Sequence, residues 1–375
     1  MNALEGIRVA DFSRVLAGPL CTMNLGDLGA EVVKVEQPGG GDETRGWGPP
    51  FVGGDAAYFL CLNRNKRSVA LDLASDRGRR AARALAARSD VLVENFRPGL
   101  MRRFGLDYES LREENPGLVY CSITAFRPDT EAVRPGYDII MQAISGLMSM
   151  TGLKGGEPVK VGVALLDVVV GLYATVGILA ALRHRERTGE GQLLSLSLFD
   201  ASVAALVNQA ANYLLGGLVP GPMGTEHPNI VPYQVFPAAD RPFVVAAAND
   251  RLFQRTCRVV GRPDLADDPR FRTNEGRVRN RDDLVSMLTA TFRERPAGEW
   301  LERLEAEGVP CAPVQALDEV FASPDGAGLI EEIEDPARGR LRLVASPLRL
   351  SATPPLTRQP PPRLGEHTEQ ILEEG

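Results

Sequence analysis

The chain has 375 residues, of which 44% are hydrophobic and 24% charged, a composition typical of a globular protein with two or three domains. Its formal net charge of -7 is opposite in sign to the surface that binds phosphates, so we expect no nucleic-acid partner. The five cysteines stand apart without metal-ligand spacing, and the opening MNALEGIRVADFS lacks a charged region followed by an apolar stretch, so we expect it not to be a signal peptide. We therefore expect reduced thiols and a cytoplasmic location.

The N-terminal half alternates β-branched strands with helices. Strands are predicted at residues 6–13, 30–36, 67–73, 90–96 and 117–124. Helices are predicted between them at residues 19–29, 76–89 and 98–105, with Pro19 near the first helical position, Gly29 at the C-cap and Asp76 as an N-cap. This alternation predicts βαβ units, and therefore an α/β fold with a doubly wound, largely parallel, Rossmann-like sheet.

The remaining elements divide the chain into two predicted domains. Long helices are predicted at residues 137–150, 167–187 and 199–215, with a strand at 192–200. A Gly/Pro-rich passage then predicts a linker over residues 216–230. A hairpin with Asp240 in its turn, followed by helices, predicts a smaller α+β domain over residues 231–334. We expect the large domain to span residues 1–215 and to be completed by residues 335–375.

One apolar run, VGVALLDVVVGLYATVGILAAL, is long enough to cross a bilayer and holds a single carboxyl group, that of Asp167. A carboxyl group in mid-membrane costs about 2.5–3.5 kcal/mol, and no second span accompanies the run, so we expect a buried helix and no membrane partner. Asp167 fits two roles, which are compatible. It can be the N-cap of a helix that begins at Val168, or a nucleophile that the helix dipole keeps ionised in apolar surroundings.

Several common active sites lack their motifs in this chain. The first predicted turn, SRVLAGP, has one glycine where a dinucleotide-binding fold needs a spaced set, and neither a P-loop nor a G-x-S-x-G elbow occurs. The histidines at positions 184, 227 and 367 lie near no evident nucleophile and have no metal-ligand spacing. The sequence therefore predicts neither a metal site nor a permanently bound cofactor.

Nine segments occur in the order and at the spacing of one known family. They are DFSRVLAGP, LGDLGAEVVKVEQPGGGDETR, NRNKRSVALDL, VLVENFRPGLMRRFGLDY, RPGYD, VALLD, RERTGEGQ, HPNIVPY and LGEHTE. Over essentially its whole length the chain resembles the family III coenzyme A-transferases, also called the carnitine dehydratase and bile-acid-inducible protein type, which include formyl-CoA:oxalate CoA-transferase. The resemblance implies an enzyme that moves CoA from an acyl-CoA donor to a small carboxylic acid, and a homodimer whose two chains interlock.

The resemblance also assigns residues to roles. Asp167, in VALLD, takes the catalytic role: it would attack the donor thioester to give a mixed anhydride, and the released CoA thiolate would then form an enzyme–CoA thioester. CoA would lie at the edge of the N-terminal sheet, where doubly wound folds bind ligands. The matched CoA-binding positions are Ala17, Leu71, Asn95, Phe96, Arg97, Arg103, Tyr137 and Asp138.

The chain departs from the family pattern at four places. Leu16 stands where the oxalate enzymes have glutamine, and Gln37 stands where many members have arginine. The segment TAFRPDTEAV lacks the usual glycines, and the hairpin ends in AAAND instead of a tetraglycine. These departures favour a larger or different acid than oxalate.

Two other functions stay open at this point. An α-methylacyl-CoA racemase has the same scaffold but needs a histidine where this chain has Tyr137, and a tyrosine with a pKa of about 10 is a poor acid–base group at neutral pH. A CoA-ester-binding protein without activity would fit the altered segment at residues 125–133. Such a protein would have no need of a desolvated Asp167.

Overall fold

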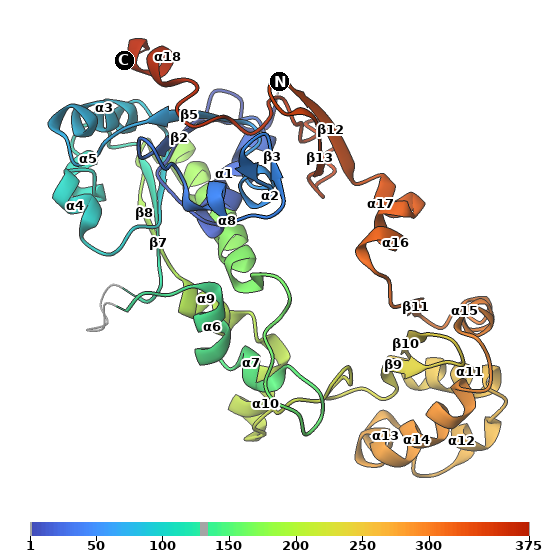
Figure 1. Ribbon diagram of the computed structural model, residues 1–375. Coiled ribbons are helices and arrows are strands. Elements are labelled where there is room, and N and C mark those ends of the chain that lie inside the picture. Colours follow the sequence, from blue (N-terminus) through green and yellow to red (C-terminus); the bar gives the residue numbers. More distant parts are fainter. Residues whose placement is uncertain (1, 128–133, 375) are drawn as a thin grey trace. The chain divides into compact units, whose positions relative to one another are not determined.

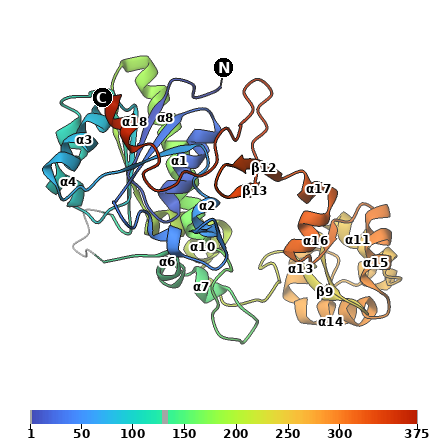
Figure 2. The ribbon, with the colours of Figure 1, turned by 45° about the horizontal axis from the view of Figure 1, so that its top comes forward.

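The computed structural model describes residues 2–127 and 134–374, and the chain forms two compact units (Figures 1 and 2). The first unit comprises residues 1–147, 160–218 and 324–375, and the second comprises 148–159 and 219–323. Residues 148–159 and 324–334 therefore group differently from the division into domains that the sequence suggests.

A six-stranded sheet forms the centre of the first unit, with the strand order β5-β2-β1-β6-β7-β8. Its strands are β1 (Arg8–Asp11), β2 (Glu31–Glu36), β5 (Lys66–Ala70), β6 (Val91–Glu94), β7 (Val119–Thr124) and β8 (Leu193–Ser197). All neighbouring strands are parallel, which confirms the predicted α/β fold with a parallel sheet. The chain places β2 and β5 on one side of β1 and the later strands on the other, so the winding direction reverses between β1 and β6.

The helices of the first unit differ from the predicted ones in detail. They are α1 (Ala17–Asp27), η1 (Glu43–Gly46), α2 (Ala57–Leu60), α3 (Asp76–Ala87), α4 (Leu100–Phe104), α5 (Tyr108–Leu111), α6 (Asp138–Ile144), α8 (Leu165–Thr188), α9 (Leu198–Ala204), α10 (Val207–Gly216), α17 (Pro324–Ala327) and α18 (Thr368–Glu373). The short helix α7 (Leu147–Met150) begins in the first unit, but its residues 148–150 group with the second. Ser75, and not Asp76, is the N-cap of α3, because its Oγ accepts a hydrogen bond from the Gly78 amide at 3.0 Å. The helix predicted at 137–150 is interrupted at Gly146, whose φ of 97° is left-handed, and the helix predicted at 199–215 is likewise divided into two.

Both faces of the sheet are buried under helices. Successive side chains of a strand point to opposite faces, so neighbouring residues of one strand belong to different apolar clusters. Val91 and Val93 belong to the apolar cluster that includes α1 and α8. Leu92, between them, belongs to the cluster on the other face, with α3, α4, α5 and α18. Figure 1 shows α3 and α4 across the sheet from α8. Burial on both faces accounts for the nearly continuous apolar character of these strands.

Helix α8 is long and apolar enough to cross a membrane by length and composition, alone among the described helices. Half of its most apolar stretch is buried inside the protein, where it packs on α1 and the sheet. A helix that packs in a protein core passes the same test of length and composition.

The C-terminal tail returns to the first unit beside β5. The Asn65 amide donates to the carbonyl of Gln359 at 3.0 Å, and Asn65 Nδ2 donates to the carbonyl of Leu356 at 2.8 Å. The buried guanidinium of Arg64 donates to the carbonyl of Val344 at 2.8 Å. Two hairpins complete this unit, namely β3 (Phe51–Val52) with β4 (Asp55–Ala56) and β12 (Ile330–Asp335) with β13 (Gly339–Val344).

The second unit has its own sheet and core. Its antiparallel strands, in the order β11-β10-β9, are β9 (Tyr233–Pro237), β10 (Pro242–Ala246) and β11 (Cys311–Pro313). Its helices are α11 (Asp250–Val259), α12 (Pro263–Asp267), α13 (Asn274–Arg279), α14 (Arg281–Phe292), α15 (Ala297–Ala306) and α16 (Leu317–Ala322). The Phe292 ring lies in its core, 5.3 Å from Trp300 and 5.0 Å from Phe236 between ring centroids.

Candidate active site

The side chain of Asn95 connects, by two hydrogen bonds, the loops that follow the carboxyl ends of β1 and β6. Its Nδ2 donates to the carbonyl of Arg14 at 2.7 Å, and its Oδ1 accepts from the amide of Arg14 at 2.8 Å. The Arg14 guanidinium lies over the ring of Phe96, with Cζ 5.0 Å from the ring centroid. Doubly wound folds bind ligands where the winding reverses, which is the position of these loops. Asn95 and Phe96 therefore stand where this fold favours a ligand.

The start of α1 lies close to α8. Ala17 is the first residue of α1 and is buried. A Cβ atom on Gly171 of α8 would come within 2.8 Å of the Ala17 carbonyl oxygen, so only glycine allows the two helices to approach this closely. Gly171 follows Asp167 by about one helical turn. The packing therefore brings the first turn of α1 close to Asp167.

Asp138, and not Asp167, caps α8. The helix begins at Leu165, so Asp167 is its third residue and the N-cap interpretation of Asp167 is wrong. Asp138 Oδ1 accepts hydrogen bonds from the amides of Leu166 at 2.8 Å and Asp167 at 3.4 Å. Its Oδ2 accepts from Gln142 Nε2 at 2.6 Å. Two predicted site residues thus meet, because one carboxylate holds the backbone that carries the other.

The Asp167 carboxyl group is difficult to ionise. Its residue is only 8% exposed, and burial, followed by the negative charge of Asp138, raises its pKa to about 7. The helix dipole therefore does not keep this group fully ionised, contrary to the expectation from sequence. With such a pKa, the carboxyl group changes its charge near neutral pH, and a desolvated carboxylate of raised basicity is a strong nucleophile.

Tyr58 is a neighbour of this group that the sequence analysis missed. Burial, followed by the negative charge of Asp167, raises the pKa of Tyr58 to about 12, so its hydroxyl group stays protonated. Its ring packs edge-on against Trp47, with 5.4 Å between the centroids. Tyr58 lies in the short helix α2, far from Asp167 in sequence, and no spacing or motif links the two positions.

The other predicted CoA-binding residues are Leu71, Tyr137, Arg97 and Arg103, of which Tyr137 directly precedes Asp138 and Arg97 directly follows Phe96. Leu71 is buried just beyond β5, where its amide donates to the carbonyl of Glu36 at 2.9 Å. Tyr137 is 56% exposed at the N-cap of α6. Arg97 and Arg103 are exposed in and near α4. Their role as CoA contacts stays a prediction.

The positions that depart from the family pattern have distinct surroundings. Leu16 is buried next to Ala17, at the N-cap of α1. Gln37 is exposed after β2. Asn249 of AAAND caps α11, where its Oδ1 accepts from the amide of Leu252 at 2.9 Å. Most of the glycine-free segment, residues 128–133, lies outside the described residues.

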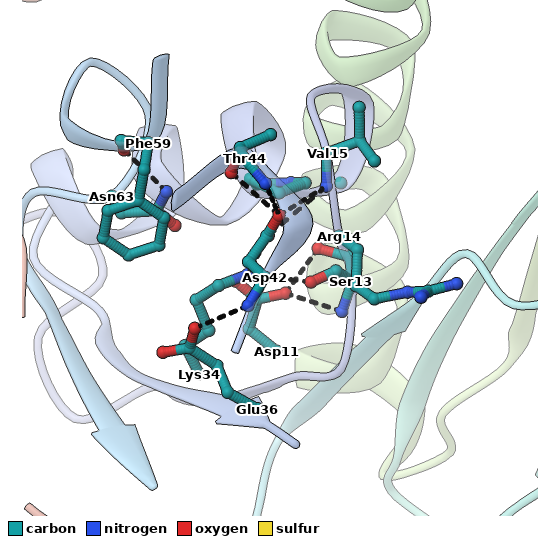
Figure 3. A network of polar contacts seen from close by, with 12 residues as sticks. Asp11, Ser13, Arg14, Val15, Lys34, Glu36, Asp42, Thr44, Phe59 and Asn63 are labelled. Atoms are coloured by element: carbon teal, nitrogen blue, oxygen red, sulfur yellow. Dashed lines mark hydrogen bonds and ion pairs between the residues drawn. The ribbon is translucent and has the colours of Figure 1, made fainter. Parts of the chain in front are cut away.

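A network of buried charges lies beneath the loop that follows β1 (Figure 3). Lys66 Nζ donates to Asp11 Oδ2 at 3.0 Å, to the carbonyl of Pro19 at 3.0 Å and to Asn63 Oδ1 at 2.9 Å. Burial alone would raise the pKa of Asp11, but the charges of Lys66 and Lys34 lower it to about 2. Burial lowers the pKa of Lys66 to about 8. The pair is therefore ionised at neutral pH.

Comparison with known proteins gives consistent matches. A family model described as CoA-transferase family III matches residues 4–368. Succinyl-CoA:glutarate CoA-transferase from Mus musculus is 45% identical, over 100% of this chain and 86% of that protein. Succinate--glutarate CoA-transferase from Agrobacterium fabrum (strain C58 / ATCC 33970) is 42% identical, over 99% of this chain and 95% of that protein. The crystal structure of a CAIB/BAIF family protein from Brucella suis superposes with a TM-score of 0.87 at 42% identity, over 100% of both chains.

Proposed function

The chain belongs to CoA-transferase family III and is a CoA-transferase, and from this premise we propose that its transfer reaction proceeds through the Asp167 carboxylate. The predicted family and enzyme class are thereby confirmed. One observation carries the proposal: Asp167 is buried at the start of α8, close to the first turn of α1, with a pKa raised to about 7.

In the proposed reaction, Asp167 attacks the carbonyl carbon of the donor thioester. The C–S bond breaks, which leaves a mixed anhydride and CoA thiolate. The thiolate attacks the aspartyl carbonyl, releases the donor acid and leaves an enzyme–CoA thioester. The acceptor carboxylate then attacks this thioester to form a second anhydride and free thiolate. Attack of the thiolate on the acceptor's acyl carbon gives the new acyl-CoA and restores Asp167.

The surroundings of Asp167 suit such intermediates. An anhydride is hydrolysed by water, and the burial of Asp167 limits the access of water to it. Asp138 holds the first turn of α8 in place, so the nucleophile keeps its position while its carboxylate is acylated. For CoA itself, we propose a position along the loops after β1 and β6, beside Ala17, Asn95 and Phe96, with Leu71 and Tyr137 as further contacts. The exposed Arg97 and Arg103 are suited to the CoA phosphates.

We further propose that the substrates are dicarboxylic acids and their CoA esters. Relatives at 45% and 42% identity over nearly the whole chain are named for succinyl-CoA or succinate and glutarate. Leu16 stands at the start of α1 where the oxalate enzymes have glutamine, which agrees with an acceptor other than oxalate. Succinyl-CoA as donor and glutarate as acceptor are therefore the first pair to test.

The mechanism predicts a covalent Asp167 intermediate that hydroxylamine converts to a hydroxamate. The enzyme is incubated with succinyl-CoA and hydroxylamine without an acceptor, and peptides that contain Asp167 are analysed by mass spectrometry. We expect the hydroxamate at Asp167 only when the acyl-CoA is present. In parallel, succinyl-CoA is tested against glutarate, oxalate and mesaconate, with glutarate expected to give the fastest formation of new acyl-CoA.

Two results would redirect this proposal. Deuterium uptake at the α-carbon of a branched acyl-CoA in heavy water, without any acceptor acid, would indicate a racemase. CoA binding without a hydroxamate and without transfer to any acid would indicate a binding protein that lacks activity.

We also propose that the enzyme is a homodimer, as the family resemblance implies. Helix α8 exposes Leu172, Tyr173 and Val176, the last at 63%, and α10 exposes Leu214 and Leu215. Large apolar side chains exposed on two helices agree with an interface, and a second copy of the chain is the expected partner. Sedimentation velocity at micromolar concentration should give a single species of twice the chain mass. A folded monomer in that experiment would contradict the proposal.

A further inference from the structure

The segment Ser13–Val15, between β1 and α1, is held almost entirely by side chains from elsewhere in the chain. The carbonyl of Ser13 accepts from Lys34 Nζ at 2.8 Å. Both backbone groups of Arg14 are bonded to Asn95. The amide of Val15 donates to the Asp42 carboxylate, with both oxygens at 3.3 Å. The shape of this segment is therefore imposed by its surroundings.

Val15 has an unusual backbone conformation within this segment. Its φ is 69°, in the left-handed region that β-branched residues avoid because Cβ approaches the backbone too closely. A residue keeps such a conformation only where neighbouring groups enforce it, and strained residues of this kind gather at functional sites. The contact that restrains Val15 at its own amide is the Asp42 carboxylate.

Asp42 is itself fixed in position. Its Oδ2 lies 2.9 Å from Lys34 Nζ, and both of these side chains are fully buried. Its Oδ1 accepts from the amide and the hydroxyl of Thr44 at 3.0 and 2.8 Å. Its own amide donates to Glu36 Oε2 at 2.9 Å. Figure 3 shows the carboxylate of Asp42 between Val15 and Thr44. Such a fixed group can impose a conformation on the loop segment that it contacts.

We propose that Asp42 is a positioning residue for acyl-CoA binding, which it serves by holding Val15 in the left-handed conformation. With Val15 fixed in this way, Arg14 lies over Phe96 and α1 begins at Ala17, close to Asp167. This inference rests on the proposed function, since it concerns the loop at which we place CoA. Asp42 acts through the loop and does not itself contact the reacting atoms.

Two independent substitutions should disturb the loop. Asp42→Asn removes the negative charge that attracts the Val15 amide and Lys34. Val15→Pro removes the amide hydrogen and forbids a positive φ. In each variant we expect KM for the acyl-CoA to rise about tenfold while kcat stays within about threefold of wild type, the pattern of a lost binding interaction. Both constants are measured on variants whose thermal unfolding is cooperative.

A rescue experiment separates loop positioning from a general loss of stability. Glycine adopts a positive φ without strain, so Val15→Gly in the Asp42→Asn background should restore most of the lost affinity. Val207 is the matched control, because it is the other valine with a positive φ among the described residues, 39°, and lies in α10. Val207→Gly in the same background should restore nothing.

Hydrogen exchange keeps this inference distinct from the proposed function. Amides of residues 13–17 should exchange at least about tenfold faster in Asp42→Asn and should regain protection in the Asp42→Asn/Val15→Gly double variant. This measurement does not depend on enzyme activity. If Asp167 proves unreactive, the proposed mechanism is wrong, but the effect of Asp42 on the exchange of residues 13–17 is still tested. An unchanged KM in folded Asp42→Asn or folded Val15→Pro, or a double variant no better than Asp42→Asn, would overturn the inference.

Discussion

Asp167→Ala should reduce kcat for CoA transfer by at least about 1,000-fold, because alanine cannot form the mixed anhydride and the direct exchange has a far higher barrier. The measurement is the formation of new acyl-CoA from succinyl-CoA and glutarate, followed by mass spectrometry. Glu186→Ala is the matched control, since Glu186 is an exposed carboxylate in the last turns of the same helix, paired with Arg183 at 3.0 Å. The control variant should keep wild-type activity. A kcat of Asp167→Ala within about tenfold of the wild-type kcat would refute the mechanism.

The pH dependence of the wild-type rate should follow the ionisation of the same group. Burial and Asp138 raise the pKa of Asp167 to about 7, and only the deprotonated form attacks the thioester. The rate should therefore increase with pH below about 7 and level off above it. Asp138→Asn removes the neighbouring negative charge, so the rising limb should move to lower pH. The rate is measured from about pH 5 to about pH 8, at intervals of about one pH unit. A rate that does not change over this range would argue against Asp167 as the attacking group.

Lys66→Met should lower the free energy of unfolding by about 3–5 kcal/mol, the usual cost of removing one partner from a buried ion pair. Asp11 would stay buried without the ammonium group that lies 3.0 Å from it, and Lys34 would only partly compensate. Urea denaturation at pH 7 measures the change. Lys160→Met is the control: Lys160 is exposed, so its replacement should change stability by less than about 0.5 kcal/mol.

A double variant tests whether the cost comes from the unpaired charge. Asp11→Asn combined with Lys66→Met leaves no charge of this pair in the core, so the double variant should recover part of the stability that Lys66→Met loses. A loss below about 1 kcal/mol in Lys66→Met would mean that Asp11 is adequately stabilised by the hydroxyl groups of Ser13 and Thr22.

The sequence predicts the parallel sheet well because every strand of it has a local signature. Residues 91–93 alternate between the apolar clusters on the two faces, and a short run rich in valine that is bounded by polar residues is typical of such a strand. The ends of helices are harder to predict. Ser75 and Asp76 are both good caps, and only the hydrogen bond to Gly78 decides between them. The break at Gly146 depends on a left-handed φ that glycine permits but does not require.

The candidate site is only partly readable from the sequence, for a related reason. Asp167 is conspicuous as a lone carboxylate in an apolar run. Asp138, which caps the helix that carries it, lies 29 residues earlier in the chain, and no local pattern links the two positions. Tyr58 is separated from Asp167, and Asp42 from Val15, by similar or longer stretches of sequence. Contacts of this kind depend on how the helices pack, which local propensity does not encode.

The return of the C-terminal tail to β5 has a consequence for the way the protein is made. Arg64 and Asn65 bond to residues that stand 280 and 291 positions later in the chain, Val344 and Leu356. During synthesis they therefore leave the ribosome long before these partners exist. The edge of the sheet at β5 gains its cover only after residues 344–359 have been made, so folding of the first unit cannot be completed while it is still being translated up to that point.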